Sequence, residues 1–116
     1  QVRLFLNGRS KEFPAMEDSG NRLVEPVTGK PVSIIAAADA KEFGSEPAGV
    51  LMIPYRAVGT KSGMLPGILF DRMEITDGEN RSVRIDRPVV AVSKEPLFFR
   101  KDFTMILPES LFTDKL

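Results

Sequence analysis

The sequence predicts a mainly β fold, a small barrel of about seven short strands with one or two short helices. Three observations lead to this prediction. Apolar runs such as 2–6 and 89–92 are short, and turn-forming residues separate them. Asn7-Gly8 is the strongest short hairpin signal that a sequence can carry. Only the stretch 37–43 combines good helix formers with a plausible glycine stop, at Gly44.

The first part of the chain is expected to form a hairpin and then a loop. Residues 2–6 and 10–16 pair across the Asn-Gly turn, which leaves Asp18 at the end of the second strand. Two prolines and a glycine punctuate the segment 21–31, so it is expected to be a loop. Residues 32–38 are apolar and predict a strand that runs into the helix.

A long hairpin is predicted in the middle of the chain. Residues 50–58 form its first strand, in which Pro54 favours an edge or a bulged position because it lacks an N–H. Residues 64–75 return as the second strand, interrupted at Pro66-Gly67. In a peptidase such a hairpin can close over the substrate as a flap. The pattern by itself favours an ordinary surface hairpin.

The last part of the chain predicts three more strands. Residues 82–86 alternate polar and apolar side chains, and 89–92 form an apolar run typical of a central strand. Ser93 is expected to cap a short helical turn. Residues 103–107 form the last strand, and 108–116 form one helical turn.

Composition limits the chemistry that the protein can perform. The chain has 116 residues and no internal linker, so 1–116 is expected to be a single domain with a modest core. The net charge is zero, so no nucleic-acid partner is expected. With no His and no Cys, a Ser-His-Asp triad and a thiol nucleophile are excluded. Carboxylates are left to carry any catalysis, and no metal or cofactor is expected.

Asp18-Ser19-Gly20 is the motif that fits carboxylate chemistry. It follows a strand-like run, as the Asp-Ser/Thr-Gly triplet of an aspartic-peptidase half-site does. The same three residue types are also the commonest formers of ordinary turns. The triplet alone therefore leaves both interpretations open.

Three stretches of the chain resemble a known family. The first is Asp-Ser-Gly-Asn-Arg-Leu at 18–23, with Glu-Pro-Val-Thr-Gly-Lys-Pro-Val following at 25–32. The second is Ile-Pro-Tyr-Arg-Ala-Val-Gly at 53–59, and the third is Val-Val-Ala-Val-Ser-Lys-Glu-Pro-Leu at 89–97. In all three the sequence is similar to the sporulation sigma-E factor-processing peptidases, the stage II sporulation GA family of endospore-forming bacteria.

The resemblance implies a retropepsin-like aspartic protease domain that forms half of a dimeric enzyme. It implies that a membrane-embedded N-terminal region, absent from this sequence, precedes a cytoplasmic peptidase domain. The expected location is the cell membrane of the sporulating mother cell. The implied substrate is the pro-form of an RNA polymerase sigma factor, and the implied activator is a signalling protein secreted from the forespore.

An aspartic peptidase needs two carboxylates that face one water, and this chain has one such triplet. A two-fold homodimer supplies the second carboxylate by placing Asp18 opposite its copy. Ser19, Gly20 and Asn21 are expected to support the site, with the Ser19 hydroxyl bonding across the dimer. The flap candidate consists of Gly59, Thr60, Lys61, Ser62 and Gly63. The remaining aspartates are expected in turns or on the surface, at positions 39, 71, 77, 86, 102 and 114.

Two departures from the retropepsin pattern leave alternatives open. Glu17 stands where an apolar residue is usual, and its charge repels the dimer partner unless the side chain points into water. The stretch that supports the catalytic loop in retropepsins is expected at 89–91, without its glycine. The alternatives are a domain that is inactive as a monomer and a β-rich interaction module without catalysis.

Overall fold

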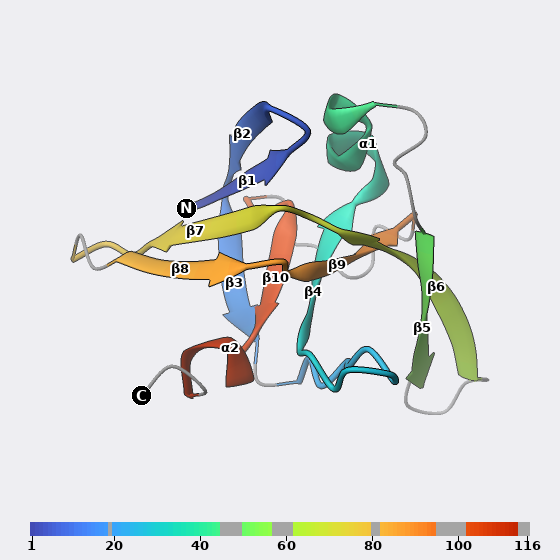
Figure 1. Cartoon of the computed structure of the whole chain (residues 1–116). Helices are drawn as coiled ribbons and strands as arrows, with labels where there is room; N and C mark the ends of the chain where they lie inside the picture. Colours follow the sequence, from blue (N-terminus) through green and yellow to red (C-terminus); the bar gives the residue numbers. More distant parts are fainter. Residues whose placement is uncertain (19, 45–49, 57–61, 80–81, 95–101, 114–116) are drawn as a thin grey trace.

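The computed structural model contains two β-sheets (Figure 1). It describes residues 1–18, 20–44, 50–56, 62–79, 82–94 and 102–113. The first sheet has the strand order β2-β1-β7-β8 and the second the order β3-β10-β4-β9-β6-β5. The four strands of the first sheet are β1 (Val2–Leu6), β2 (Arg9–Phe13), β7 (Arg72–Thr76) and β8 (Ser82–Asp86). The six strands of the second are β3 (Ala15–Asp18), β4 (Val32–Ala36), β5 (Val50–Arg56), β6 (Ser62–Leu69), β9 (Val89–Ser93) and β10 (Met105–Pro108).

The described helices are short and lie where the sequence predicts them. The predicted helix at 37–43 forms as α1 (Ala37–Ala40) and a 3₁₀ turn, η1 (Lys41–Phe43). Gly44 ends it with a φ of 112°, a conformation that favours glycine. The C-terminal turn forms as α2 (Ser110–Thr113). No described helix is long and apolar enough to cross a bilayer.

The prediction of a mainly β fold is confirmed, but the described residues form ten strands rather than about seven. The difference arises where the chain passes from one sheet to the other. It does so at Pro14, which separates β2 from β3, and at Phe70-Asp71, which separates β6 from β7. Asp71 N donates to Phe5 O at 2.9 Å, whereas Phe70 N donates to Pro88 O at 2.9 Å.

The predicted interruption at Pro66-Gly67 is wrong, because β6 continues through it. Pro66 lies opposite Met52, and Pro54 lies opposite Met64, two residues along the same ladder. Antiparallel ladders alternate hydrogen-bonded and non-bonded pairs, so the two prolines occupy the same class of pair. Their missing N–H groups therefore both fall outside the β5–β6 bonds. The edge position predicted for Pro54 is confirmed, because β5 is the last described strand of its sheet.

The predicted hairpins are present. β1 and β2 pair antiparallel across Asn7-Gly8, with φ values of 53° and 80° that only Asn, Asp and Gly adopt readily. β5 and β6 pair from Val50↔Ile68 to Arg56↔Ser62. Ser93 ends β9, and the rest of the helical turn predicted after it lies outside the described residues.

Two apolar clusters form the buried core, and the larger one joins the two sheets. The larger cluster contains an aromatic series in which the rings of Phe13 and Phe43 lie 6.1 Å apart and those of Phe43 and Phe70 5.1 Å apart. We call the smaller cluster the hairpin cluster. Leu23, from the loop after Asp18, and Tyr55 of β5 both pack against it. Its buried members are Val32, Ile53, Leu65, Val89 and Ala91. The hairpin and the loop after Asp18 therefore share one set of buried contacts.

Gly63 makes a close contact within the β5–β6 hairpin. It pairs with Tyr55, and a Cβ at this position would stand 2.8 Å from the Tyr55 ring and hydroxyl. Such a distance is shorter than side chains tolerate. The tyrosine ring therefore occupies the space that the missing side chain leaves.

Gly63→Ala is expected to lower the free energy of unfolding by roughly 1–3 kcal/mol, because it drives the Tyr55 ring off the hairpin cluster. Urea unfolding measures the change. In a Tyr55→Ala background the same substitution is expected to cost little, which a double-mutant cycle detects. Gly78→Ala is the control, since a Cβ there meets nothing within 4 Å. Equal costs for Gly63→Ala with and without Tyr55 would contradict this account.

Candidate active site

Asp18 lies at the C-terminal end of β3, the outer described strand of the six-stranded sheet. Its side chain is half-buried. The neighbouring strand is β10, which runs parallel to β3 and places Pro108 opposite Asp18. β10 also pairs with β4, so it lies between the strand that leads to Asp18 and the strand that follows its loop.

The stretch 89–91, expected to support the Asp18 loop, belongs to β9. This strand pairs in parallel with β4, the strand that follows the loop, and not with β3. The strand that pairs with β3 itself is β10, whose sequence Met-Ile-Leu-Pro is fully buried. The predicted strand at 103–107 followed by a helical turn was the signal that could have identified it.

The residues after Asp18 form a tight turn. Gly20 N donates to Asp18 Oδ1 at 2.9 Å, and Asn21 N donates to Asp18 O at 3.0 Å. A Cβ on Gly20 would stand 3.2 Å from the same carboxylate oxygen, which is closer than most real contacts. Glycine thus lets the backbone approach the carboxylate, as predicted. Ser19 lies outside the described residues.

Asn21 fixes the loop to the next strand. Its amide is buried, with Nδ2 donating to Val32 O at 3.0 Å and Oδ1 accepting from Leu23 N at 3.2 Å. Val32 N in turn donates to Leu23 O at 3.0 Å. Each hydrogen-bonding atom of the Asn21 side chain therefore has a partner in the backbone.

Glu25 organises the rest of the loop, a role that sequence reasoning missed. Its buried carboxylate accepts hydrogen bonds from Val27 N at 2.9 Å and from the N and Oγ1 of Thr28, both at 2.8 Å. The Val27 N–H contributes most to holding the pKa of Glu25 below its ordinary value, and the two Thr28 donors and the Lys30 charge act in the same direction. Burial opposes them and raises the pKa.

The loop is expected to lose stability in acid through Glu25. A carboxyl group whose pKa is lowered by folding stabilises the fold fully above its unfolded value, here 4.5, and loses that contribution as the pH falls through the folded pKa. Glu25→Gln is therefore expected to unfold at a lower temperature than the wild type at neutral pH. The two melting temperatures should converge in acid.

Thermal unfolding from about pH 7 down to about pH 3 measures this convergence. Glu17→Gln is the control, because Glu17 is exposed at the neighbouring end of β3. A difference between wild type and Glu25→Gln that stays constant with pH would show that the loop does not depend on the carboxylate.

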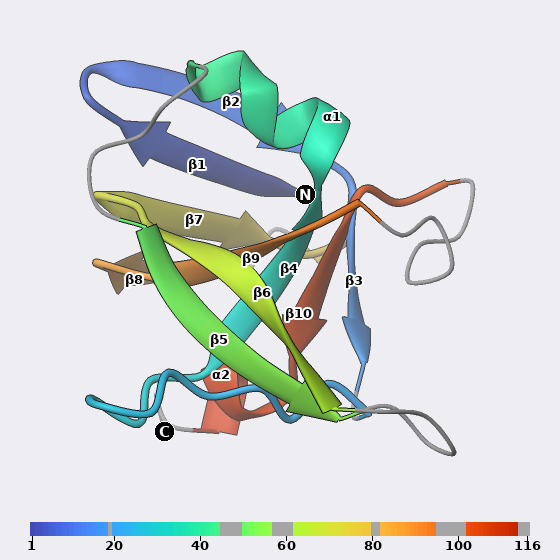
Figure 2. The same cartoon turned by 90° about the vertical axis from the view of Figure 1, so that its right-hand side faces the viewer.

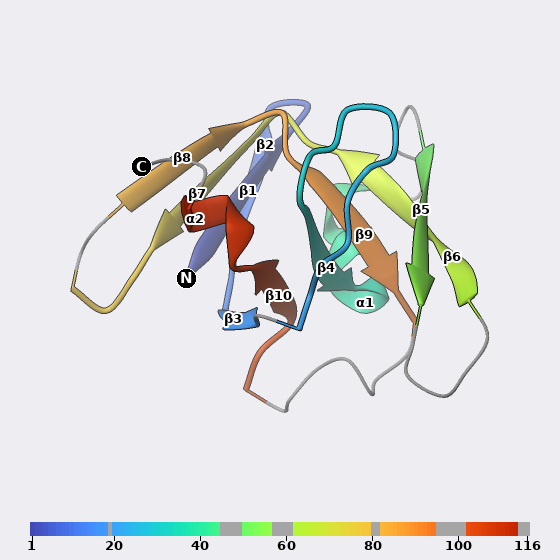
Figure 3. The same cartoon turned by 90° about the horizontal axis from the view of Figure 1, so that it is seen from below.

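The flap candidate is described only in part. Gly59, Thr60 and Lys61 lie outside the described residues, whereas Ser62 and Gly63 begin β6. In Figure 2 the described end of the hairpin lies at the same lower corner as the Asp18 end of β3. Figures 1 and 3 show the two separated across the width of the molecule. The described strands of the hairpin therefore end on the same side of the molecule as Asp18, at a distance from it across the molecule.

The other acidic residues near the motif or along the chain have different settings. Glu17 is exposed, so it points away from half-buried Asp18 as strand alternation requires. Asp71 accepts from Asn7 N at 2.9 Å, and Asp86 pairs with Arg84 at 3.0 Å. No three acidic side chains among the described residues come together as a metal site. Asp77 follows β7 and precedes Gly78, but it is exposed, whereas Asp18 is half-buried at the end of β3.

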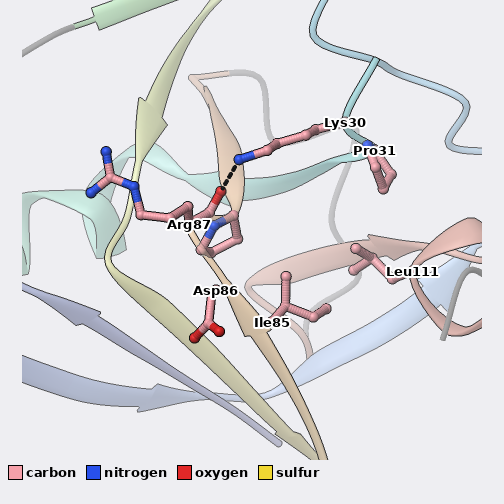
Figure 4. Close-up of a pocket in the computed structure, with 7 residues that line it drawn as sticks. Lys30, Pro31, Ile85, Asp86, Arg87 and Leu111 are labelled. Carbon is pink, nitrogen blue, oxygen red and sulfur yellow. Dashed lines mark hydrogen bonds between the residues drawn. The ribbon is translucent and has the colours of Figure 1, made fainter. Parts of the chain in front are cut away.

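A pocket of about 140 Å³ lies apart from Asp18 (Figure 4). It is lined by Lys30, Pro31, Ile85, Asp86, Arg87, Pro88 and Leu111. None of these residues belongs to β3 or to the β5–β6 hairpin.

Comparison with known proteins identifies the family. The model of the sporulation factor SpoIIGA family matches residues 1–111. A sporulation sigma-E factor-processing peptidase of Priestia megaterium is 25% identical over 95% of this chain and 43% of its own length. A protein of Bacillus thuringiensis subsp. kurstaki, named as a candidate sporulation sigma factor-processing peptidase, is 23% identical over 100% of this chain and 86% of its own length.

The chain spans less than half the length of the Priestia megaterium relative. No solved structure matches it significantly. The family match covers nearly all of the described fold, from β1 to the first residues of α2, and includes Asp18 and its turn. The chain therefore belongs to the sporulation factor SpoIIGA family.

Proposed function

We propose that the protein is an aspartic endopeptidase that acts as a homodimer and processes the pro-form of a sporulation sigma factor. The observation that carries the proposal is the setting of Asp18, a half-buried carboxylate at a strand end whose Oδ1 is held by the N–H of Gly20. The names of the two relatives support the substrate class, since both are called sigma factor-processing peptidases.

The need for a second copy follows from the count of suitable carboxylates. Aspartic peptidases use two that share one proton, because two like charges about 3 Å apart do not both ionise easily. Asp77 of the same chain also follows a strand and precedes a glycine, but it is exposed and its sequence, Asp-Gly-Glu, lacks the Asp-Ser/Thr-Gly triplet. A two-fold axis beside the free edge of β3 would bring Asp18 of one copy to Asp18 of the other.

The reaction then proceeds by general acid–base catalysis. One carboxylate takes a proton from the bound water, and the other donates a proton to the oxygen of the scissile carbonyl. In each copy the N–H of Gly20 keeps the Asp18 carboxylate oriented through its 2.9 Å hydrogen bond. In this proposal Ser19 bonds across the dimer, and the segment 59–63 of each copy closes over the substrate as a flap.

The setting in the cell belongs to the same proposal. The peptidase acts on the cytoplasmic side of the mother-cell membrane, to which a region outside this sequence attaches it. A protein from the forespore activates it. Both statements rest on the resemblance described above and are tested in sporulating cells by fractionation and by deletion of the activator.

Subunit mixing tests the dimeric mechanism directly. Wild-type protein and Asp18→Asn are mixed in equal amounts, allowed to exchange subunits, and assayed for cleavage of the purified pro-sigma factor. If both carboxylates are required, only wild-type dimers cleave, and random pairing leaves about one quarter of the activity of the same total amount of wild type.

The alternatives predict different numbers. An enzyme that works as a monomer leaves about one half of the activity in the mixture, because each wild-type subunit acts alone. A chain that cleaves nothing at any concentration, even when sedimentation shows a dimer, would contradict the proposal. Activity that rises with the square of the protein concentration at low concentration would support it.

A further inference from the structure

The pocket of Figure 4 has a chemistry that the proposed peptidase mechanism does not use. Three segments that are distant in sequence form it: the end of the loop before β4, the turn between β8 and β9, and α2. Ile85 of β8 and Leu111 of α2 point toward each other across it. Leu111 is buried, and Pro31 and Pro88 add two rigid apolar walls.

Lys30 and Arg87 are the two cations of the lining, and the Arg87 guanidinium lies 3.8 Å from the Asp71 carboxylate. Lys30 Nζ donates to Arg87 O at 3.0 Å, and an ammonium group has three donors. No other described group bonds to Lys30 Nζ. The Asp86 carboxylate lies on the opposite side from Lys30 in Figure 4, and it bonds instead to Arg84 Nε at 3.0 Å. The mouth is therefore suited to an anionic group.

The turn that carries one wall of the pocket is held in an uncommon conformation. Arg87 has a φ of 56°, which a residue with a long side chain rarely adopts. Its N–H donates to Asp71 O at 3.1 Å, and its guanidinium lies 3.8 Å from the Asp71 carboxylate. Strained backbone persists where the surrounding structure holds it, and it is frequent at binding sites.

The size of the pocket decides what kind of ligand it takes. Sites for small molecules usually enclose roughly 300–1,000 Å³, whereas this pocket has about 140 Å³, the scale of one amino-acid side chain. The loop that supplies Lys30 also exposes two apolar side chains, with Val27 90% exposed and Val24 49% exposed. Glu25 keeps this loop ordered, so these side chains are presented on a fixed backbone.

We propose that this pocket docks a separate protein partner, which inserts one aliphatic side chain that has a carboxylate beside it. The aliphatic group fills the space between Ile85 and Leu111, and the carboxylate pairs with Lys30. Neither β3 nor the hairpin lines the pocket, so a peptide held at Asp18 does not need to pass through it.

The docked partner would contact both segments that hold Asp18. Lys30 and Pro31 lead directly into Val32, whose carbonyl accepts the Asn21 amide. Leu111 closely follows Pro108, which lies opposite Asp18. Binding is therefore expected to perturb the Asn21 amide as well as the pocket. Only the consequence of this contact for cleavage rests on the proposed function.

The test measures binding in a protein that cannot cleave. Asp18→Asn labelled with ¹⁵N is titrated with acetyl-Asp-Leu-Asp-amide, and amide shifts are followed by NMR. The expected result is saturable shifts at Lys30, Ile85 and Leu111. Acetyl-Asp-Ala-Asp-amide lacks the large aliphatic side chain that fills the pocket, so it should bind at least roughly tenfold more weakly. Acetyl-Lys-Leu-Lys-amide should also bind more weakly, because its charge is opposite.

Lys30→Gln gives the matched variant. It is expected to abolish the preference for the acidic peptide over the basic one while leaving the preference for Leu over Ala. Lys94→Gln is the control, because Lys94 is exposed and does not line the pocket. Equal binding of the Leu and Ala peptides, or no shift at the pocket, would overturn the proposal.

Two further outcomes would assign the pocket to another occupant, and either of them would also overturn the proposal. Shifts of the same amides on dilution without peptide would identify a second copy of this chain. Shifts of the same amides with purified pro-sigma factor would identify the substrate. Because Asp18→Asn is used throughout, the binding result is independent of whether the wild type is an aspartic peptidase.

Discussion

Replacing Asp18 with Asn is expected to lower the rate of pro-sigma factor cleavage roughly 10³-fold or more, because the remaining amide can neither accept nor supply the proton that the mechanism requires. Asn has the same shape as Asp, and its oxygen can still accept the hydrogen bond from Gly20 N. The fold is therefore expected to remain, with an unchanged circular dichroism spectrum and a similar melting temperature.

Single-turnover cleavage at saturating enzyme measures the effect on chemistry separately from substrate binding. Asp86→Asn is the matched control, since Asp86 is exposed, lines the pocket of Figure 4 and not the Asp18 turn, and forms a surface ion pair with Arg84. Such pairs contribute about 0–1 kcal/mol to stability, so this variant should cleave normally. Turnover by purified Asp18→Asn that equals the wild-type rate would leave the interaction module as the better interpretation of the Asp-Ser-Gly turn.

Asn21→Asp is expected to lower the free energy of unfolding by roughly 2–4 kcal/mol at neutral pH. The substitution changes no volume, but it replaces the amide nitrogen that donates to Val32 O at 3.0 Å with an oxygen that cannot donate while it is ionised. A buried carboxylate would then face a carbonyl oxygen. Cleavage should fall in parallel, because the same amide holds the loop that follows Asp18.

The penalty of Asn21→Asp is expected to shrink in acid. Burial beside a carbonyl raises the pKa of the new carboxyl group in the folded state, so the folded state binds its proton at a higher pH than the unfolded state. Once protonated, the group can donate to Val32 O again. The difference in unfolding free energy between variant and wild type, measured at each pH, removes the separate effect of Glu25.

Asn7→Asp is the matched control for the same chemical change. Asn7 is exposed in the β1–β2 turn with a φ of 53°, a conformation that Asp also tolerates. The substitution places a charge near the exposed Asp71 carboxylate, which accepts from the backbone N of residue 7 at 2.9 Å, so it is expected to lower stability by less than about 1 kcal/mol at neutral pH. If Asn21→Asp were as mild as this control, the buried amide would not be what fixes the loop.

Local structure was predictable wherever a few neighbouring residues determine it. Asn7-Gly8 produced its hairpin, Gly44 ended its helix, and Asp18 lies at a strand end before a glycine turn. Composition excluded imidazole and thiol chemistry without any coordinates. The family resemblance also lay in local stretches, and the family match over residues 1–111 confirms it.

The tertiary structure decided which segments meet. β10 lies beside Asp18 and β9 lies beside β4, and the sequence did not predict these neighbours, because they depend on pairing between distant segments and not on local pattern. For the same reason β6 continues through Pro66. The strand predicted at 64–75 divides at Phe70-Asp71, where the chain passes to the other sheet.

Burial separated side chains that look alike in the sequence. Asn21 was expected to support the site and Glu25 had no expected role, yet both are buried and bonded to backbone N–H or C=O groups. Lys30 and Leu111 meet at a pocket only because the loop, the β8–β9 turn and α2 converge. The sequence by itself determined the β class, the turn chemistry and the family. The partners of each polar group were decided by the tertiary structure, because hydrogen bonds and buried contacts join residues far apart along the chain.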